Sequence, residues 1–198
     1  MTALLAEGRG YQLLAPQDDR GLTWEGLPPS HGGPALILAE ASTGAMSAYL
    51  SARVARQVVP WLHRGALVAA HEHFALTMGE FQADAPAITI LATHGGQGLV
   101  ATAGGHRTVC HRGRRGRMIE GDVLRPRIAQ VTWRPGSTLM VLALSTAGAL
   151  PIGAVGRALI ACPTPAEACR HLVHEARNAD PHLHHGAIVL AYPTENAA

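Results

Sequence analysis

Apolar residues fall into short continuous runs, which predict buried strands, and into four-residue spacings, which predict helices. The clearest case is residues 34–65. The run Ala35–Ala39 is bounded by glycine and proline and predicts a buried strand. Apolar residues then recur every fourth position from Met46 to Leu62, which predicts a helix with one apolar face. Pro60 is expected to bend or end that helix, because proline breaks the helical hydrogen-bond pattern.

The same patterns predict further elements along the chain. Helices are predicted over Ala66–Met78 and Ile152–Ala161, and from a Thr164 cap to about Asn178. Residues 1–10 are expected to be a loose start. Strands are predicted over Tyr11–Leu14, Leu22–Trp24, Ala87–Ala92, Leu99–Thr102, Arg107–His111, Ile128–Trp133, Leu139–Leu144 and Ala187–Tyr192. Because strands and helices come in blocks rather than in strict alternation, the order favours an α+β fold.

Composition narrows the functional class. The 198 residues are 47% apolar, which suits one globular domain over residues 1–193, with 194–198 as a disordered tail. The net charge of +2 argues against a strong nucleic-acid binder. No apolar run is long enough to suggest membrane insertion, and the three cysteines lack metal-ligand spacing. The expected setting is therefore the cytoplasm, with reduced thiols and no nucleic-acid or membrane partner.

Several groups could carry chemistry or recognition. Glu40 places a carboxylate where a strand meets the turn before a long helix, as a site residue or as an ordinary polar turn residue. The run Arg112–Arg117 is a solvated basic loop or a contact for an acidic or phosphorylated partner. Cys110 beside His111 is a candidate nucleophile or an ordinary buried thiol.

Histidines are a further open alternative. The chain holds 12 of them, and three lie together near the C-terminus. These could bind a soft metal such as Zn²⁺ or Ni²⁺ together with a histidine of the preceding helix, or could form a solvated loop. The residues concerned are His171, His174, His182, His184 and His185.

Short motifs stand at the ends of the predicted strands. They are Pro16-Gln17-Asp18, Ala39-Glu40-Ala41-Ser42-Thr43-Gly44, Gly104-Gly105-His106-Arg107, Pro135-Gly136-Ser137, Ser145-Thr146-Ala147 and His185-Gly186. These motifs, together with the order of strands and helices, resemble those of the metal-dependent type 2C (PPM) protein phosphatases. The resemblance covers nearly the whole chain. In length the chain is most similar to the small bacterial members of stress-response and sporulation partner switching. The resemblance implies a four-layer α-β-β-α sandwich of two mostly antiparallel sheets flanked by helices.

The resemblance also implies which residues would hold the two Mn or Mg ions of such enzymes. Asp18 would be the retained early acid, and Glu40 stands where the family has the metal-bridging aspartate. Thr146 and His185 stand where the family has further metal-binding acids, so two of the four acids are missing. The other degenerate family positions are Ala41, Gly44, His106, Arg107, Ser145 and Gly186.

These losses matter because hard cations such as Mg²⁺ and Mn²⁺ need charged oxygen ligands. The main hypothesis is a pseudophosphatase without a cofactor, which binds a phosphorylated regulator or its kinase. One alternative is an active divergent Ser/Thr phosphatase that holds Mn or Mg at Asp18, Glu40 and His185. Another is a structural or assembly protein that keeps only the scaffold. A homodimer is compatible with each of these three hypotheses.

Overall fold

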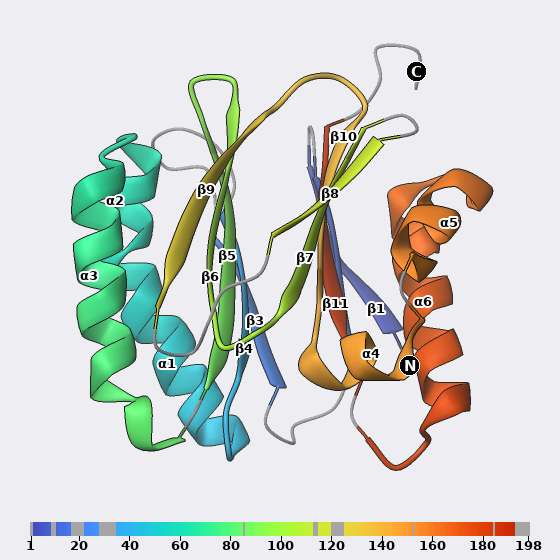
Figure 1. The fold of residues 1–198 in the computed structure, drawn as a ribbon, viewed down its shortest axis with the longest axis horizontal. Helices are drawn as coiled ribbons and strands as arrows, with labels where there is room; N and C mark the ends of the chain where they lie inside the picture. The colour runs from blue at the N-terminus through green and yellow to red at the C-terminus, as the bar shows by residue number, and fades with distance from the viewer. Residues whose placement is uncertain are drawn as a thin grey trace. The chain divides into compact units, whose positions relative to one another are not determined.

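The structure, a computed structural model, describes residues 2–8, 11–16, 22–27, 35–84, 86–112, 115–119, 125–151, 153–183 and 185–192. Its contacts divide the chain into two compact units, whose elements are labelled in Figure 1. Unit 1 comprises Met1–Asp18, Arg107–Ile119 and Arg134–Ala198, and unit 2 comprises Asp19–His106 and Glu120–Trp133. The single domain over 1–193 stays a prediction, and the expected tail lies outside the described residues.

Unit 2 is built on a five-stranded antiparallel sheet with the order β3-β4-β5-β6-β9. Its strands are β3 (Leu22–Leu27), β4 (Ala35–Glu40), β5 (Ala87–His94), β6 (Gln97–Ala103) and β9 (Arg127–Thr132). The helices α1 (Gly44–Gln57), α2 (Val59–His63) and α3 (Leu67–Glu80) cover one face, as Figure 1 shows, and the 3-10 turn η1 (Gln82–Asp84) follows. Alternate strand residues such as Ile37 and Ile90 form the core with Leu50 and Phe74 of the helices. The apolar face of the sheet, formed by alternate strand residues, therefore packs against the apolar faces of the helices to form one core.

The long helix expected after the central strand is present, but it is interrupted. Thr43 caps α1 by accepting a hydrogen bond from the backbone N–H of Met46 (3.1 Å). The helix ends at Gln57, and α2 begins with Pro60 in its first turn. Proline is tolerated there because the first turn of a helix needs no amide donor. The predicted bend or end at Pro60 is thus confirmed, as a break just before it.

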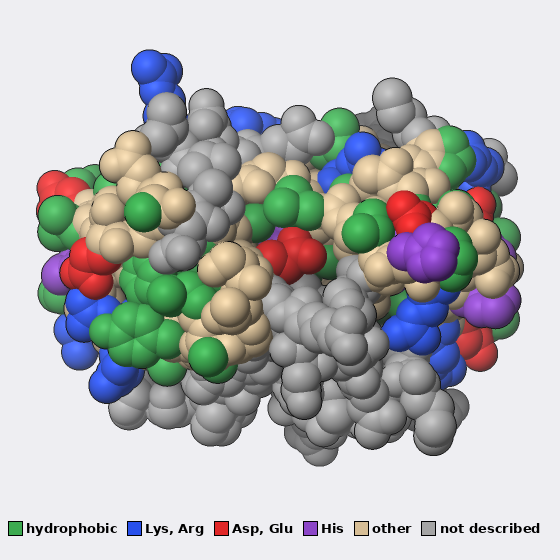
Figure 2. Space-filling model, turned by 90° about the horizontal axis from the view of Figure 1, so that it is seen from below, with side chains coloured by type: hydrophobic (Ala, Val, Ile, Leu, Met, Phe, Trp, Pro, Cys, Tyr) green, Lys and Arg blue, Asp and Glu red, His purple; other side chains and the backbone are tan. Residues whose placement is uncertain are grey.

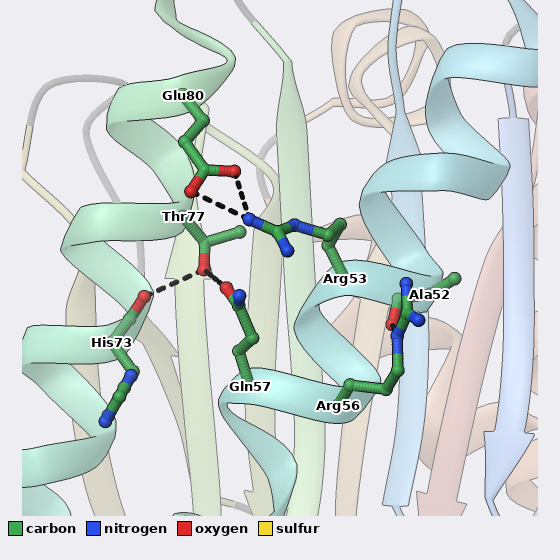
Figure 3. A network of polar contacts seen from close by, with 7 residues as sticks. All are labelled: Ala52, Arg53, Arg56, Gln57, His73, Thr77 and Glu80. Atoms are coloured by element: carbon green, nitrogen blue, oxygen red, sulfur yellow. Dashed lines mark hydrogen bonds and ion pairs between the residues drawn. The ribbon is translucent and has the colours of Figure 1, made fainter.

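A polar network joins α1 to α3 (Figure 3). Arg53 forms an ion pair with Glu80 through Nη2, with N–O distances of 2.8 and 2.5 Å. The buried Thr77 hydroxyl donates to the carbonyl of His73 (2.8 Å). That hydroxyl has one proton, so it accepts from the Gln57 amide, whose oxygen then accepts from Arg53. The Gln57 amide and the Thr77 hydroxyl are satisfied in this arrangement, whereas Nε of Arg53 is buried without a hydrogen-bond partner among the described residues.

Unit 1 contains a four-stranded antiparallel sheet with the order β11-β10-β7-β8. Its strands are β7 (Arg107–Arg112), β8 (Arg115–Ile119), β10 (Ser137–Leu142) and β11 (Ala187–Ala191). A hairpin of β1 (Thr2–Gly8) and β2 (Tyr11–Pro16) lies beside β11. The helices are α4 (Leu144–Ala149), α5 (Ala154–Ala161) and α6 (Pro165–Ala179). The apolar face of α6, with Leu172 and Val173, packs on Met140 and Val189 of the sheet.

The start of α6 follows its sequence closely. The Thr164 hydroxyl accepts from the backbone N–H of Glu167, and the Glu167 carboxylate accepts from the backbone N–H of Thr164, both at 3.2 Å. This is the capping box that the Thr-Pro-x-Glu order predicts. The expected α+β class, with two mostly antiparallel sheets flanked by helices, is confirmed as well. No helix in the described ranges has both the length and the apolar character needed to cross a membrane.

Three local predictions were wrong. Residues 2–8 are a strand rather than a loose start, because pairing with β2 stabilises them where their own sequence pattern is weak. The strand β8 was missed, since its sequence is basic and glycine-containing rather than apolar. The strand predicted over Leu139–Leu144 ends at Leu142, and α4 follows. One continuous apolar run spans that junction, so periodicity could not separate strand from helix.

Candidate functional site

Glu40 and His106 meet at one end of the sheet of unit 2. Glu40 is the last residue of β4, and His106 follows the turn that closes β6. Nε2 of His106 lies 2.9 Å from Oε2 of Glu40, and since an ionised carboxylate can only accept, the ring nitrogen donates. The imidazole is fully buried, whereas the Glu40 side chain keeps 17% of its surface exposed. The pair therefore consists of a partly accessible carboxylate and a fully buried imidazole that donates a hydrogen bond to it.

Two threonines continue this contact into the sheet. Nδ1 of His106 lies 3.2 Å from the hydroxyl of Thr89, which lies 2.8 Å from the hydroxyl of Thr102. Both threonines are fully buried and face each other across β5 and β6. A hydroxyl can donate or accept a hydrogen bond. Thr89 can therefore donate to Nδ1 of a neutral His106 ring, or accept from Nδ1 of a protonated ring. Glu40, His106, Thr89 and Thr102 are called the relay below.

The backbone before His106 fixes where its ring lies. Gly104 and Gly105 both have φ in the left-handed region, +82° and +86°, which glycine adopts without strain. A Cβ on Gly104 would lie only 2.3 Å from the carbonyl oxygen of Pro86. This close approach brings the start of β5 against the end of β6, where Glu40 pairs with Ala87. The turn therefore delivers the ring to the carboxylate.

In unit 1, Thr146 is held by the backbone of Gly186. Its hydroxyl donates to the carbonyl of Gly186 (3.1 Å) and accepts from the N–H of the same residue (2.9 Å). Thr146 is buried in the first turn of α4, so this contact joins α4 to the start of β11. The N–H of Ala143 also donates to the Gly186 carbonyl (2.9 Å). The hydroxyl thus has a structural role between two backbone segments.

His185 is buried beside this contact. Its Nε2 donates to the carbonyl of Asp180 (2.7 Å), since a carbonyl can only accept. The ring is 1% exposed, and its Nδ1 has no hydrogen-bond partner among the described residues. The imidazole therefore ties the end of α6 to the start of β11.

No protein-family model matches the sequence, and no curated protein matches it. Solved structures do match. PppA, "a key regulatory component of T6SS in Pseudomonas aeruginosa", is 14% identical over 96% of both chains, with a TM-score of 0.66. RsbX, solved in complex with magnesium, is 13% identical over 96% of this chain and 98% of its own, with a TM-score of 0.69.

A third match is the phosphatase domain of SpoIIE from Bacillus subtilis, at 11% identity and a TM-score of 0.68. It covers 97% of this chain and 98% of its own. The fold is that of the PPM phosphatases. The resemblance that rested on the sequence motifs is confirmed at the level of fold, across the length of the chain.

The positions that the sequence motifs matched lie in several elements of the fold, and their roles at a site stay predictions. Asp18 lies outside the described residues. Ala41 and Gly44 flank the start of α1, Arg107 begins β7 and Ser145 lies in α4. No group of three or more His, Cys, Asp or Glu side chains among the described residues could hold a metal ion. On the face drawn in Figure 2 the described acidic side chains are scattered rather than gathered.

The thiols fit structural roles. Burial raises the pKa of Cys110, and the positive charge of Arg117 offsets this only in part. Burial also raises the pKa of the fully buried Cys169 to about 12. Because the thiolate is the reactive form, neither group is activated as a nucleophile. Cys110 is thus an ordinary half-buried thiol of the β7 strand.

The sequence named Glu40 and His106 separately but did not predict that they pair. The two residues are far apart in the chain, and sequence spacing carries no information on such a contact. Thr89 and Thr102 were missed as site residues, although the hairpin turn between β5 and β6 contained a signal. A tight turn at Gly95 and Gly96 fixes the register that places these threonines opposite each other.

Replacement of Thr146 by valine should lower the free energy of unfolding by about 1–2 kcal/mol. The buried N–H of Gly186 would lose its acceptor, and an unsatisfied buried donor carries this penalty. Thr146→Ser keeps the hydroxyl and should therefore lower the free energy of unfolding by less than Thr146→Val. Urea denaturation of the three proteins measures the difference, and equal stability of valine and wild type would contradict the assigned role.

Proposed function

We propose that this chain is a catalytically impaired PPM-type phosphatase-like protein, which acts by binding a protein partner in Ser/Thr phospho-signalling. The observation that carries the proposal is the pairing of Glu40 with His106. Glu40 stands where the resemblance implies a metal-bridging carboxylate, yet one of its oxygens accepts from a buried imidazole. The imidazole hydrogen bond uses one of about four lone-pair sites of the carboxylate, which leaves fewer of them for bridging cations.

The side chains at the other two positions where the family has metal-binding acids, Thr146 and His185, fit a two-metal centre poorly. The Thr146 hydroxyl is neutral, donates to the carbonyl of Gly186 and accepts from the N–H of the same residue. His185 uses Nε2 to donate to Asp180. Mg²⁺ and Mn²⁺ select charged, hard oxygen ligands, which these two positions do not offer. The pattern supports a scaffold whose internal hydrogen bonds have replaced metal ligation.

The likeness to regulatory proteins supports the partner-binding half of the proposal. PppA is described as a regulatory component, and SpoIIE as a cell fate determinant. The coarse role proposed for this chain is that of a PPM-like protein that acts on or with another protein. The identity of the partner, a phosphorylated regulator or its kinase, belongs to the proposal.

The test combines metal binding and hydrolysis on the full chain. Calorimetric titration with Mn²⁺ should give no heat of binding at millimolar metal, for wild type and Glu40→Ala alike. Release of phosphate from a phosphoserine protein should be the same with Mn²⁺ and with EDTA. Mn²⁺-dependent hydrolysis that is abolished by Asp18→Ala would overturn the proposal in favour of an active divergent phosphatase.

A further inference from the structure

The β7–β8 hairpin carries positive charge that no described acidic group neutralises. Four arginines lie within residues 112–117. Arg112 and Arg117 are exposed, and in the described part of the chain neither forms an ion pair or a side-chain hydrogen bond. Like charges on neighbouring strands repel each other. A bound anion would remove this repulsion.

Strand register places the two exposed arginines on one face. Arg112 pairs with Arg115, and Cys110 pairs with Arg117. Direct cross-strand partners share a face, as do residues two apart in one strand. Arg112 and Arg117 are therefore diagonal neighbours, with about 7–8 Å between positions of this kind. Both long side chains can reach one phosphate group, to which guanidinium groups donate strong paired hydrogen bonds.

The outer edge of β8 is suited to receive an extended segment. β8 is the last strand of its sheet and, among the described residues, pairs only with β7. Met118 lies on the face opposite Arg117 and is 50% exposed. A segment that added to this edge would place its side chains alternately near the arginines and near Met118.

We propose that the β8 edge binds an extended segment of the partner protein that carries a phosphorylated serine or threonine next to an apolar residue. The phosphate would be bound by Arg112 and Arg117, and the apolar neighbour would lie against Met118. This rests on the proposed function and adds the place and chemistry of the contact. A nucleic acid is disfavoured by the low net charge of +2 and by the absence of aromatic residues in 112–119.

The test measures fluorescence anisotropy of short labelled peptide pools with the full chain in EDTA. One pool has phosphoserine at its centre between apolar residues, and its counterpart has serine. The Arg112→Ala/Arg117→Ala protein should bind the phosphorylated pool about tenfold more weakly than wild type, as the loss of hydrogen bonds to a charged group implies. The matched control is Arg125→Ala/Arg127→Ala, which removes two other exposed arginines and the same net charge.

Amide hydrogen exchange gives a second measurement that does not depend on a variant. Bound phosphorylated peptide should slow exchange in residues 115–119, because backbone pairing at the β8 edge protects its outward N–H groups. Equal binding of both pools, equal losses in both double variants, or stronger binding of a single-stranded DNA oligonucleotide would overturn the proposal. Mn²⁺-dependent hydrolysis would overturn the proposed function instead, so the two failures are distinguishable.

Discussion

Replacement of His106 by alanine should lower the free energy of unfolding by about 3 kcal/mol. The change removes a fully buried ring and leaves the partly buried Glu40 carboxylate and the Thr89 hydroxyl without it. Breaking a buried charged contact by removing one partner carries a penalty of this order, and the 17% exposure of Glu40 places the value at the lower end. Urea or guanidinium denaturation measures the difference.

A double-mutant cycle separates the contact from the cavity. In Glu40→Gln/His106→Ala the cavity remains but the carboxylate charge is gone. The double variant should therefore lose less free energy of unfolding than the sum of the two single losses. The surface variant His182→Ala, exposed on the loop after α6, serves as a control for removal of an imidazole. Strictly additive losses would show that Glu40 and His106 do not interact in the folded protein.

Replacement of Gly104 by alanine should destabilise the protein by about 3 kcal/mol or more. A left-handed φ of +82° costs a residue with a Cβ about 1–2 kcal/mol. The Cβ would in addition lie 2.3 Å from both the carbonyl oxygen of Pro86 and Cα of Ala87, which must move apart. The thermal unfolding midpoint and the free energy of unfolding should both fall.

Gly96 provides the matched control. Its φ is +73°, but nothing lies within 4 Å of a Cβ built on it. Gly96→Ala should therefore show the backbone strain alone, about 1–2 kcal/mol. If the two glycine variants were equally stable, the close approach of β5 and β6 would not be a feature of the folded protein.

The sequence predicted the strands and helices whose patterns are local. The apolar run at Ala35–Ala39 and the Thr164 cap contain their own signals, and both lie where expected. Residues 2–8 form a strand only through pairing, so no local pattern could indicate it. Sequence motifs named Glu40, His106, Thr146 and Gly186, whose roles at a site stay predictions. The partner of each side chain depends on contacts between distant segments, and these contacts came from the fold alone.

The interleaving of the two units along the chain has a consequence for how the protein folds. The chain passes from one unit to the other after Asp18, His106, Ile119 and Trp133, so neither unit is a continuous segment. No single proteolytic cut or truncation can release either unit intact. Both sheets also depend on pairings between distant strands, such as β10 with β7, whose loop-closure entropy slows folding. The protein should therefore fold slowly and only once most of the chain is available, which makes synthesis of the last strand, β11, a late requirement for unit 1.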